Sequence, residues 1–98
     1  MPRLKISDAI LKGMRRFPKQ AIGELQDGKF AACVMGCANF GATGDATNWP
    51  YQVGRVSYHG WEKELSKFHC QYGVLPFELN NREVSREDIV GMFQAIGL

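Results

Sequence analysis

The spacing of apolar residues predicts an amphipathic helix near the start of the chain. Its apolar positions recur at helical spacing and are Ile10, Leu11, Met14 and Phe17. Ser7 is a good N-cap, and Asp8 suits the first turn because its charge complements the helix dipole. Since Pro18 disfavours helical geometry at the preceding Phe17, this helix should end close to Arg16.

The same periodicity predicts two helices in the second half of the chain. The first begins near Trp61 and should stop at Gly73, and its apolar stripe consists of Trp61, Leu65, Phe68 and Tyr72. The second follows Ser85, which can cap it in a capping-box manner with Asp88 at the third helical position. The buried stripe of this last helix consists of Ile89, Met92, Phe93 and Ile96, and Gly97 should end it.

The segment from Gly28 to Gly44 has another pattern, because from residue 31 to residue 43 it is uncharged and mostly small. Alanine favours helix and the run is longer than a typical strand, so a helix from about Ala31 to Gly41 is expected. Every face of that helix would be apolar or small. It should therefore lie at the centre of the fold, with neighbours approaching closely.

Together these elements predict a single, mainly helical domain over residues 1–98, with about four helices around the central small-residue helix. Asp27-Gly28 is a turn signal that allows a short β-hairpin near residues 20–32, but a tight connection into the central helix is favoured there. Residues 50–58 are the other place for a short hairpin, and an α+β fold is the alternative. The length of 98 residues and a hydrophobic content of 45% also indicate one globular domain. The expected core consists of Ile10, Met14, Phe17, Cys33, Val34, Cys37, Phe40, Leu65, Phe68, Ile89, Phe93 and Ile96.

Apolar runs and cysteine content indicate the compartment. No stretch approaches the roughly 20 apolar residues that span a bilayer, and charges run through the N-terminal residues where a signal peptide needs an apolar region. The three cysteines are an odd number for a disulfide framework, so reduced thiols are expected. We therefore expect a cytoplasmic protein with no membrane partner.

The net charge of +2 conceals an uneven distribution. Residues 1–20 contain six basic residues and one acidic residue, whereas the remaining residues contain six basic and nine acidic ones. Lys12, Arg15 and Arg16 project from the polar side of the first helix, and nucleic-acid binding through them and an aromatic loop is one hypothesis. The isoelectric point of about 8.5 lies below the strongly basic range of such binders, so this hypothesis is the alternative.

A long connection between the central helix and the next one carries that aromatic loop. Its candidate partner-binding residues are Trp49, Tyr51, Arg55, Tyr58, His59 and Trp61. No Ser-His-Asp elbow, phosphate-binding glycine loop or HExxH motif occurs in the sequence, so no catalytic residue and no cofactor is assigned. The leading hypothesis is a small non-enzymatic module that binds an unknown protein partner or a second copy of itself.

Zinc binding is the second alternative. Cys33, Cys37 and Cys70 with either His69 or His59 would supply four nitrogen and sulfur ligands. The spacing argues against such a site, because the adjacent side chains of His69 and Cys70 diverge and do not form the usual second ligand pair. Buried cysteine also behaves as a small hydrophobe, so close packing is the favoured role of Cys33 and Cys37.

Two further segments have recognisable patterns. One is the G-x-x-x-x-C-x-x-G pattern from Gly28 to Gly36, and the other is Leu79-Asn80-Asn81 followed by the S-x-E-x-I run from Ser85 to Ile89. Together they resemble a group of small uncharacterised proteins from bacteria and tailed phages. This chain differs in having Cys37 where the group tends to have alanine and Asn81 where it tends to have aspartate. The resemblance implies a mostly helical fold with a central small-residue helix and a phage or prophage origin, and it brings no activity with it.

Overall fold

The computed structural model describes residues 4–46, 51–52, 55–56 and 61–98. Within these ranges the chain forms five helices, which are α1 (Ile6–Arg16), α2 (Val34–Thr43), α3 (Glu62–Tyr72), α4 (Pro76–Asn81) and α5 (Arg86–Ala95). The strands are β1 (Lys19–Gln20), β2 (Gln26–Asp27), β3 (Ala31–Ala32), β4 (Tyr51–Gln52) and β5 (Arg55–Val56). The fold is mainly α with a small β element, as the periodicity predicts.

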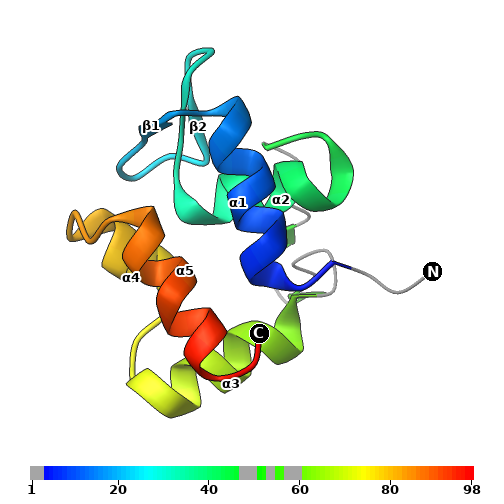
Figure 1. Cartoon of the computed structure of the whole chain (residues 1–98), viewed down its shortest axis with the longest axis vertical. Helices are drawn as coiled ribbons and strands as arrows, with labels where there is room; N and C mark the ends of the chain where they lie inside the picture. Colours follow the sequence, from blue (N-terminus) through cyan, green and yellow to red (C-terminus); the bar gives the residue numbers. More distant parts are fainter. Residues whose placement is uncertain (1–3, 47–50, 53–54, 57–60) are drawn as a thin grey trace.

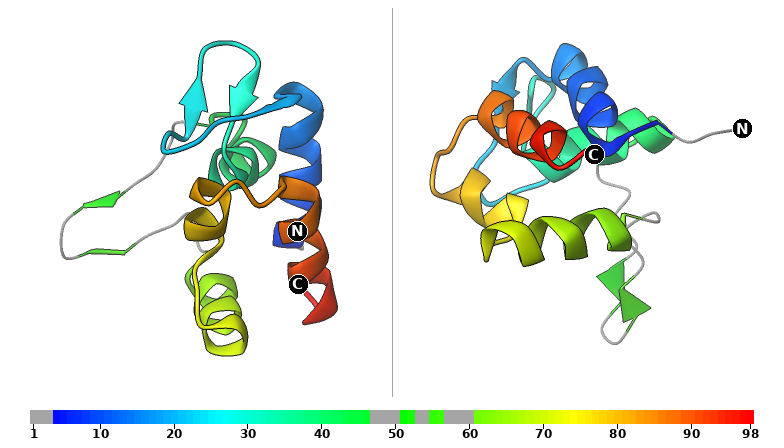
Figure 2. Two further views of the ribbon diagram at one scale, coloured as in Figure 1. Left: turned by 90° about the vertical axis from the view of Figure 1, so that its left-hand side faces the viewer. Right: turned by 60° about the horizontal axis from the view of Figure 1, so that its bottom comes forward.

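The elements form a bundle with the small sheet at one end and α3 at the other (Figures 1 and 2). Helix α1 packs chiefly against α2 and also against α5. The sheet has the order β1-β3-β2, in which β1 runs parallel and β2 antiparallel to β3. Lys19 and Asp27 are both in register with Ala31, on its opposite sides. A hairpin is thus present near residues 20–32, where the sequence favoured a tight connection, and β4 and β5 form a second antiparallel pair between residues 51 and 56.

The predicted end signals hold at the start of α5 and the end of α3 but not at the start of α1. Ser85 Oγ accepts a hydrogen bond from the backbone N–H of Asp88, and Gly73 ends α3 with a φ of 69°. The expectation that Ser7 caps α1 is wrong, because the helix begins at Ile6 with Lys5 at the N-cap. The Ser7 hydroxyl instead donates to the carbonyl oxygen of Leu98 at 2.9 Å, which ties α1 to the end of the described chain.

The central helix begins three residues later than its composition predicts. Ala31 and Ala32 pair as β3, and Cys33 becomes the N-cap of α2 with its sulfur accepting from the N–H of Gly36. Composition also gave no sign of α4, which has only six residues and begins with Pro76. A helix this short is less than two turns and shows no periodic pattern.

Glycine permits the close contact between α1 and α2. A Cβ atom on Gly13 would lie 2.2 Å from the carbonyl oxygen of Cys37, and one on Gly41 would lie 2.1 Å from that of Ala9. Both distances are far below van der Waals contact, so the two helix backbones touch directly. This confirms that α2 is a central helix with closely packed neighbours.

The core contains all of the residues that the pattern predicts. Nine are buried, and Met14, Phe40 and Ile96 are partly buried and pack against them. The ring of Phe68 lies between Tyr72 and Phe93, with centroid distances of 4.8 and 4.5 Å. The contact between Phe68 and Phe93 fastens α3 to α5.

Candidate functional site

The predicted aromatic loop lies mostly outside the described residues. This holds for Trp49, Tyr58 and His59, and for the side chains of Tyr51 and Arg55. Trp61 is described, but it is only 1% exposed. It lies on the same stripe as Leu65 and Phe68 and belongs to the core, so the expectation of Trp61 in an exposed binding loop is corrected.

The predicted zinc ligands are not brought together. Cys33 and Cys37 are buried, whereas His69 and Cys70 are exposed on α3. Among the described residues, no group of three or more His, Cys, Asp or Glu side chains could hold a metal ion, and all three cysteines are free thiols. His59, the alternative ligand, lies outside the described ranges.

Arg86 places a buried cation beside one of these thiols. Its side chain is 3% exposed, and Nη1 donates to the carbonyl oxygens of Phe17 at 2.7 Å and Ala32 at 3.1 Å. The same nitrogen lies 3.2 Å from Cys37 Sγ. Burial raises the pKa of Cys37 to about 11, although Arg86 opposes this shift. The thiol is therefore neutral near pH 7 and lacks the low pKa of a nucleophilic cysteine.

Asn80 forms a second buried polar link. Its Oδ1 accepts from the N–H of Val34 at 2.9 Å and from Gln20 Nε2 at 3.1 Å, and its Nδ2 donates to the carbonyl oxygen of Ala21 at 2.7 Å. Together with Arg86 it connects the C-terminal helices to β1, β3 and α2. Asn80 belongs to the Leu79-Asn80-Asn81 stretch of the resemblance, which is the signal that could have singled it out, whereas Arg86 stands at a variable position of the S-x-E-x-I run and has no such signal.

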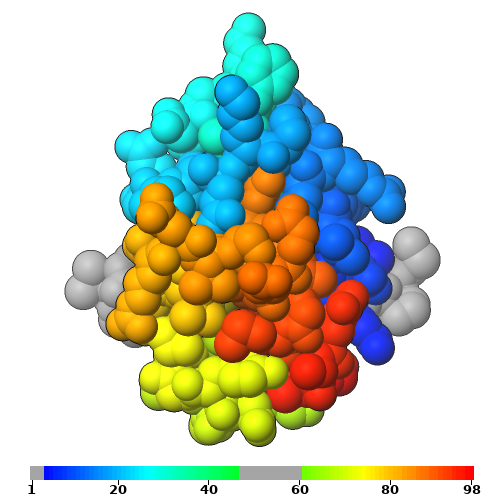
Figure 3. Space-filling model, turned by 60° about the vertical axis from the view of Figure 1, so that its left-hand side comes forward, coloured from blue at the N-terminus to red at the C-terminus, as the bar shows by residue number. Residues whose placement is uncertain are grey.

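A basic surface is found where the end of α1 meets the β2–β3 hairpin. We call it the hairpin-end surface, and it comprises Lys12, Arg15, Arg16, Lys19, Lys29 and Phe30, all of which are exposed. Arg16 Nη1 donates to the carbonyl oxygen of Lys29 at 2.7 Å, and the N–H of Lys19 donates to that of Phe30 at 2.9 Å. The first bond holds the hairpin against α1 and the second holds it against β1. The hairpin projects from the body of the molecule (Figure 3).

Phe30 is the most exposed large apolar side chain in the described part of the chain, at 61%. The guanidinium of Arg16 lies 4.8 Å from the ring of its neighbour Phe17, which limits the freedom of this arginine. The structure thus joins the predicted cations Lys12, Arg15 and Arg16 to three residues of the hairpin region. The sequence pattern did not single out Lys19, Lys29 or Phe30, because only the fold places them beside α1.

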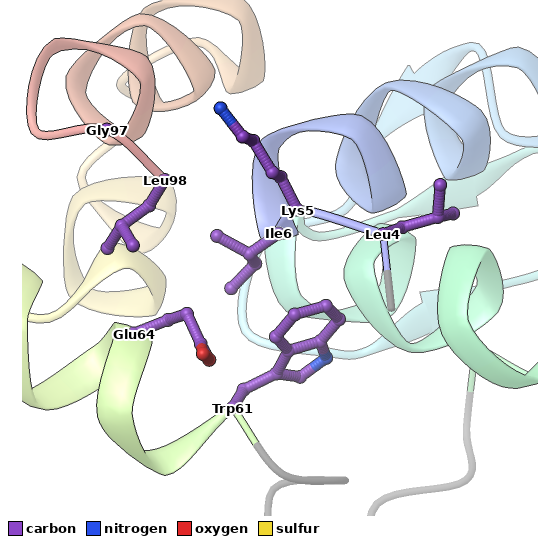
Figure 4. Close-up of a pocket in the computed structure, with 7 residues that line it drawn as sticks. All are labelled: Leu4, Lys5, Ile6, Trp61, Glu64, Gly97 and Leu98. Atoms are coloured by element: carbon purple, nitrogen blue, oxygen red, sulfur yellow. The ribbon is translucent and has the colours of Figure 1, made fainter. Parts of the chain in front are cut away.

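A cavity of about 200 Å³ lies toward the opposite end of the molecule. Its lining consists of Leu4, Lys5, Ile6, Trp61, Glu64, Gly97 and Leu98 (Figure 4). The Oε2 atom of Glu64 is buried and has no hydrogen-bond partner among the described residues. The rest of the lining is mostly apolar, so the cavity has no set of convergent polar groups that would define a ligand.

Comparisons of the chain with protein-family models, with curated proteins and with solved structures find no match. The resemblance to phage proteins therefore stays a prediction. Within the described ranges, no helix is long and apolar enough to cross a membrane.

Proposed function

We propose that this protein is a small non-enzymatic interaction module that binds its partner through the hairpin-end surface. The supporting observation is the 61% exposure of Phe30 on a hairpin beside exposed cations. Transfer of an exposed aromatic side chain from water into the interface with a partner is favourable, because apolar surface is removed from water. Aromatic residues and arginine are also the types enriched at the centre of protein interfaces.

The surface is formed before a partner arrives. Arg16 is bonded to the backbone of Lys29, and β3 is paired on both sides, by β1 and by β2. Groups that are already ordered lose less conformational entropy on binding. This preorganisation supports a role in recognition.

The proposal moves the contact surface away from the aromatic loop. Trp61 is the one aromatic side chain of that loop that the structure describes, and it is buried in the core, whereas Phe30 is exposed. The cytoplasm remains the proposed compartment because three cysteines do not suit a disulfide framework. A phage or prophage origin remains a proposal from the resemblance.

Photo-crosslinking tests the location of the surface. A benzophenone amino acid is placed at position 30 and, as a control, at position 77, where Phe77 is 39% exposed on α4. In cells that naturally make the protein, position 30 should give discrete adducts and position 77 should give few. Equal adducts at both positions, or none at position 30, would refute the proposal.

A further inference from the structure

The charges of the hairpin-end surface favour a polyanion. Five cations lie on it, whereas the nearby acidic residues are Asp8, one helical turn from Lys12 on α1, and Glu24 and Asp27 of the hairpin region. Asp27 lies across β3 from Lys19, on the far edge of the sheet. Lys12 is one helical turn from Arg16 on the same face of α1, which extends the row of cations away from the hairpin.

Phe30 adds a feature that a simple basic patch lacks. Among the described residues, no aromatic ring and no cation stacks on its ring, and Lys29 precedes it directly. An exposed ring beside backbone-binding cations is how proteins hold single-stranded nucleic acids, with a base stacked on the ring. In a duplex the bases are stacked on one another and offer no free face except at an end.

We infer that the partner of the hairpin-end surface is a single-stranded nucleic acid, with its phosphates along the cations and a base stacked on Phe30. This inference rests on the proposed function and adds the chemical class of the partner. An acidic protein would match the same charges and would cover the ring with an apolar side chain of its own, and crosslinking of position 30 to a protein is the outcome that would identify it.

Binding of a fluorescent 20-nucleotide thymidine strand, followed by fluorescence anisotropy, tests the inference. With about five phosphate contacts, log K should fall with log salt at a slope of about −3.5, which is roughly a 100-fold loss from 50 to 200 mM. Phe30→Ala should weaken binding about 5-fold or more, as expected for loss of one stacked base. Lys19→Gln and Lys29→Gln should each reduce the slope by about 0.7.

Two matched variants keep the assay specific. Phe77→Ala removes another exposed aromatic ring and Lys63→Gln removes a cation from α3, and neither should change affinity by more than about twofold, since neither contacts the surface. Circular dichroism of each variant checks that it is folded. If either control weakens binding as much as Phe30→Ala does, the assignment of the surface is wrong.

Three further results would overturn the inference. They are no binding to the strand at 50 mM salt, equal affinity for a duplex of the same length, and full affinity in Phe30→Ala. Position-30 crosslinks to a protein without any oligonucleotide binding would refute the nucleic-acid partner and leave the proposed interaction module standing. An absence of crosslinks at position 30 together with tight strand binding unaffected by Phe30→Ala would refute both.

Discussion

The glycine contact between α1 and α2 can be tested by adding one methyl group. In Gly13→Ala the new Cβ would lie 2.2 Å from the carbonyl oxygen and 2.4 Å from the Cα of Cys37. Both atoms belong to the backbone of α2, so no side-chain rotation can relieve the clash. Reaching an ordinary contact of 3.4 Å requires the helices to separate by about 1 Å.

This separation should cost about 3 kcal/mol, the upper end of the range for overpacking, because it loosens the main helix contact of the core. Alanine has a better helix propensity than glycine by about 1 kcal/mol, which leaves a net loss of about 2 kcal/mol. A domain of this size has a free energy of unfolding of roughly 5–15 kcal/mol, so the variant should still fold.

Urea denaturation followed by circular dichroism measures this loss. With an m-value of about 2 kcal/mol/M, the midpoint should fall by about 1 M. Gly91→Ala is the matched control, since Gly91 also lies inside a helix but a Cβ there meets nothing within 4 Å. That variant should gain about 0.5–1 kcal/mol. If Gly13→Ala is as stable as Gly91→Ala, the close approach of the two helices is wrong.

Three other changes test the interior. Burial raises the pKa of Cys37 from 9.0 to about 11, so the folded state favours the protonated thiol. This group should therefore leave the free energy of unfolding unaffected below pH 9. Between pH 9 and pH 11 the free energy of unfolding should fall by roughly 2–3 kcal/mol, because the thiol ionises more readily in the unfolded chain. Urea titrations across this range should show that Cys37→Ala loses that part of the pH dependence at only a modest cost near pH 7. Asn80→Ala leaves the N–H of Val34 and the carbonyl oxygen of Ala21 without a partner, so it should lower the free energy of unfolding by about 2–4 kcal/mol. Asn81→Ala changes an exposed position and should cost less than about 1 kcal/mol. Similar losses in the two variants would contradict the role of Asn80. Gly36→Ala would place a Cβ 2.0 Å from the carbonyl oxygen of Leu25 and should cost about 1–3 kcal/mol in the same assay, and an unchanged midpoint would show that the hairpin is not fixed there.

Local patterns predicted the long helices well, because their apolar stripes and caps lie within a few residues of one another. The predicted stop at Gly73 and the Ser85 cap are of this kind, and both are confirmed. The Ser7 cap is wrong for a tertiary reason. Its hydroxyl is bonded to Leu98, which lies 91 residues away, and no local pattern contains that partner.

The hairpin region was harder to predict because its strands have only two residues each. Ala31 and Ala32 favour helix by composition but lie in the middle strand, where pairing on both sides outweighs propensity. The same pairing sets Phe30 beside Lys19. Half of the candidate surface could therefore be predicted from α1, and the other half depends on the fold.

The sequence identified buried aromatic residues where they lie on a helical stripe, but it gave no sign that Phe30 is exposed. Trp61 and Phe30 both stand beside charged residues in the chain, yet one is in the core and the other in water. Trp61 starts a helical stripe that continues into α3, which was a correct sign of burial. Phe30 precedes a two-residue strand, which is too short to show the alternation of apolar and polar residues that would predict which side chains are buried.

The position of Arg86 has a consequence for partly folded forms of the chain. It satisfies the carbonyl oxygens of Phe17 and Ala32 from α5, across 69 and 54 residues of sequence. An intermediate with α1, the sheet and α2 assembled but α5 detached would lack this donor at both carbonyls. The carbonyl oxygen of Ala32 would keep its bond from the N–H of Ala21, whereas that of Phe17 would lose its described donor. A buried acceptor without a partner costs about 1–3 kcal/mol. Such intermediates are therefore disfavoured, and the two halves of the chain should fold and unfold as one cooperative unit.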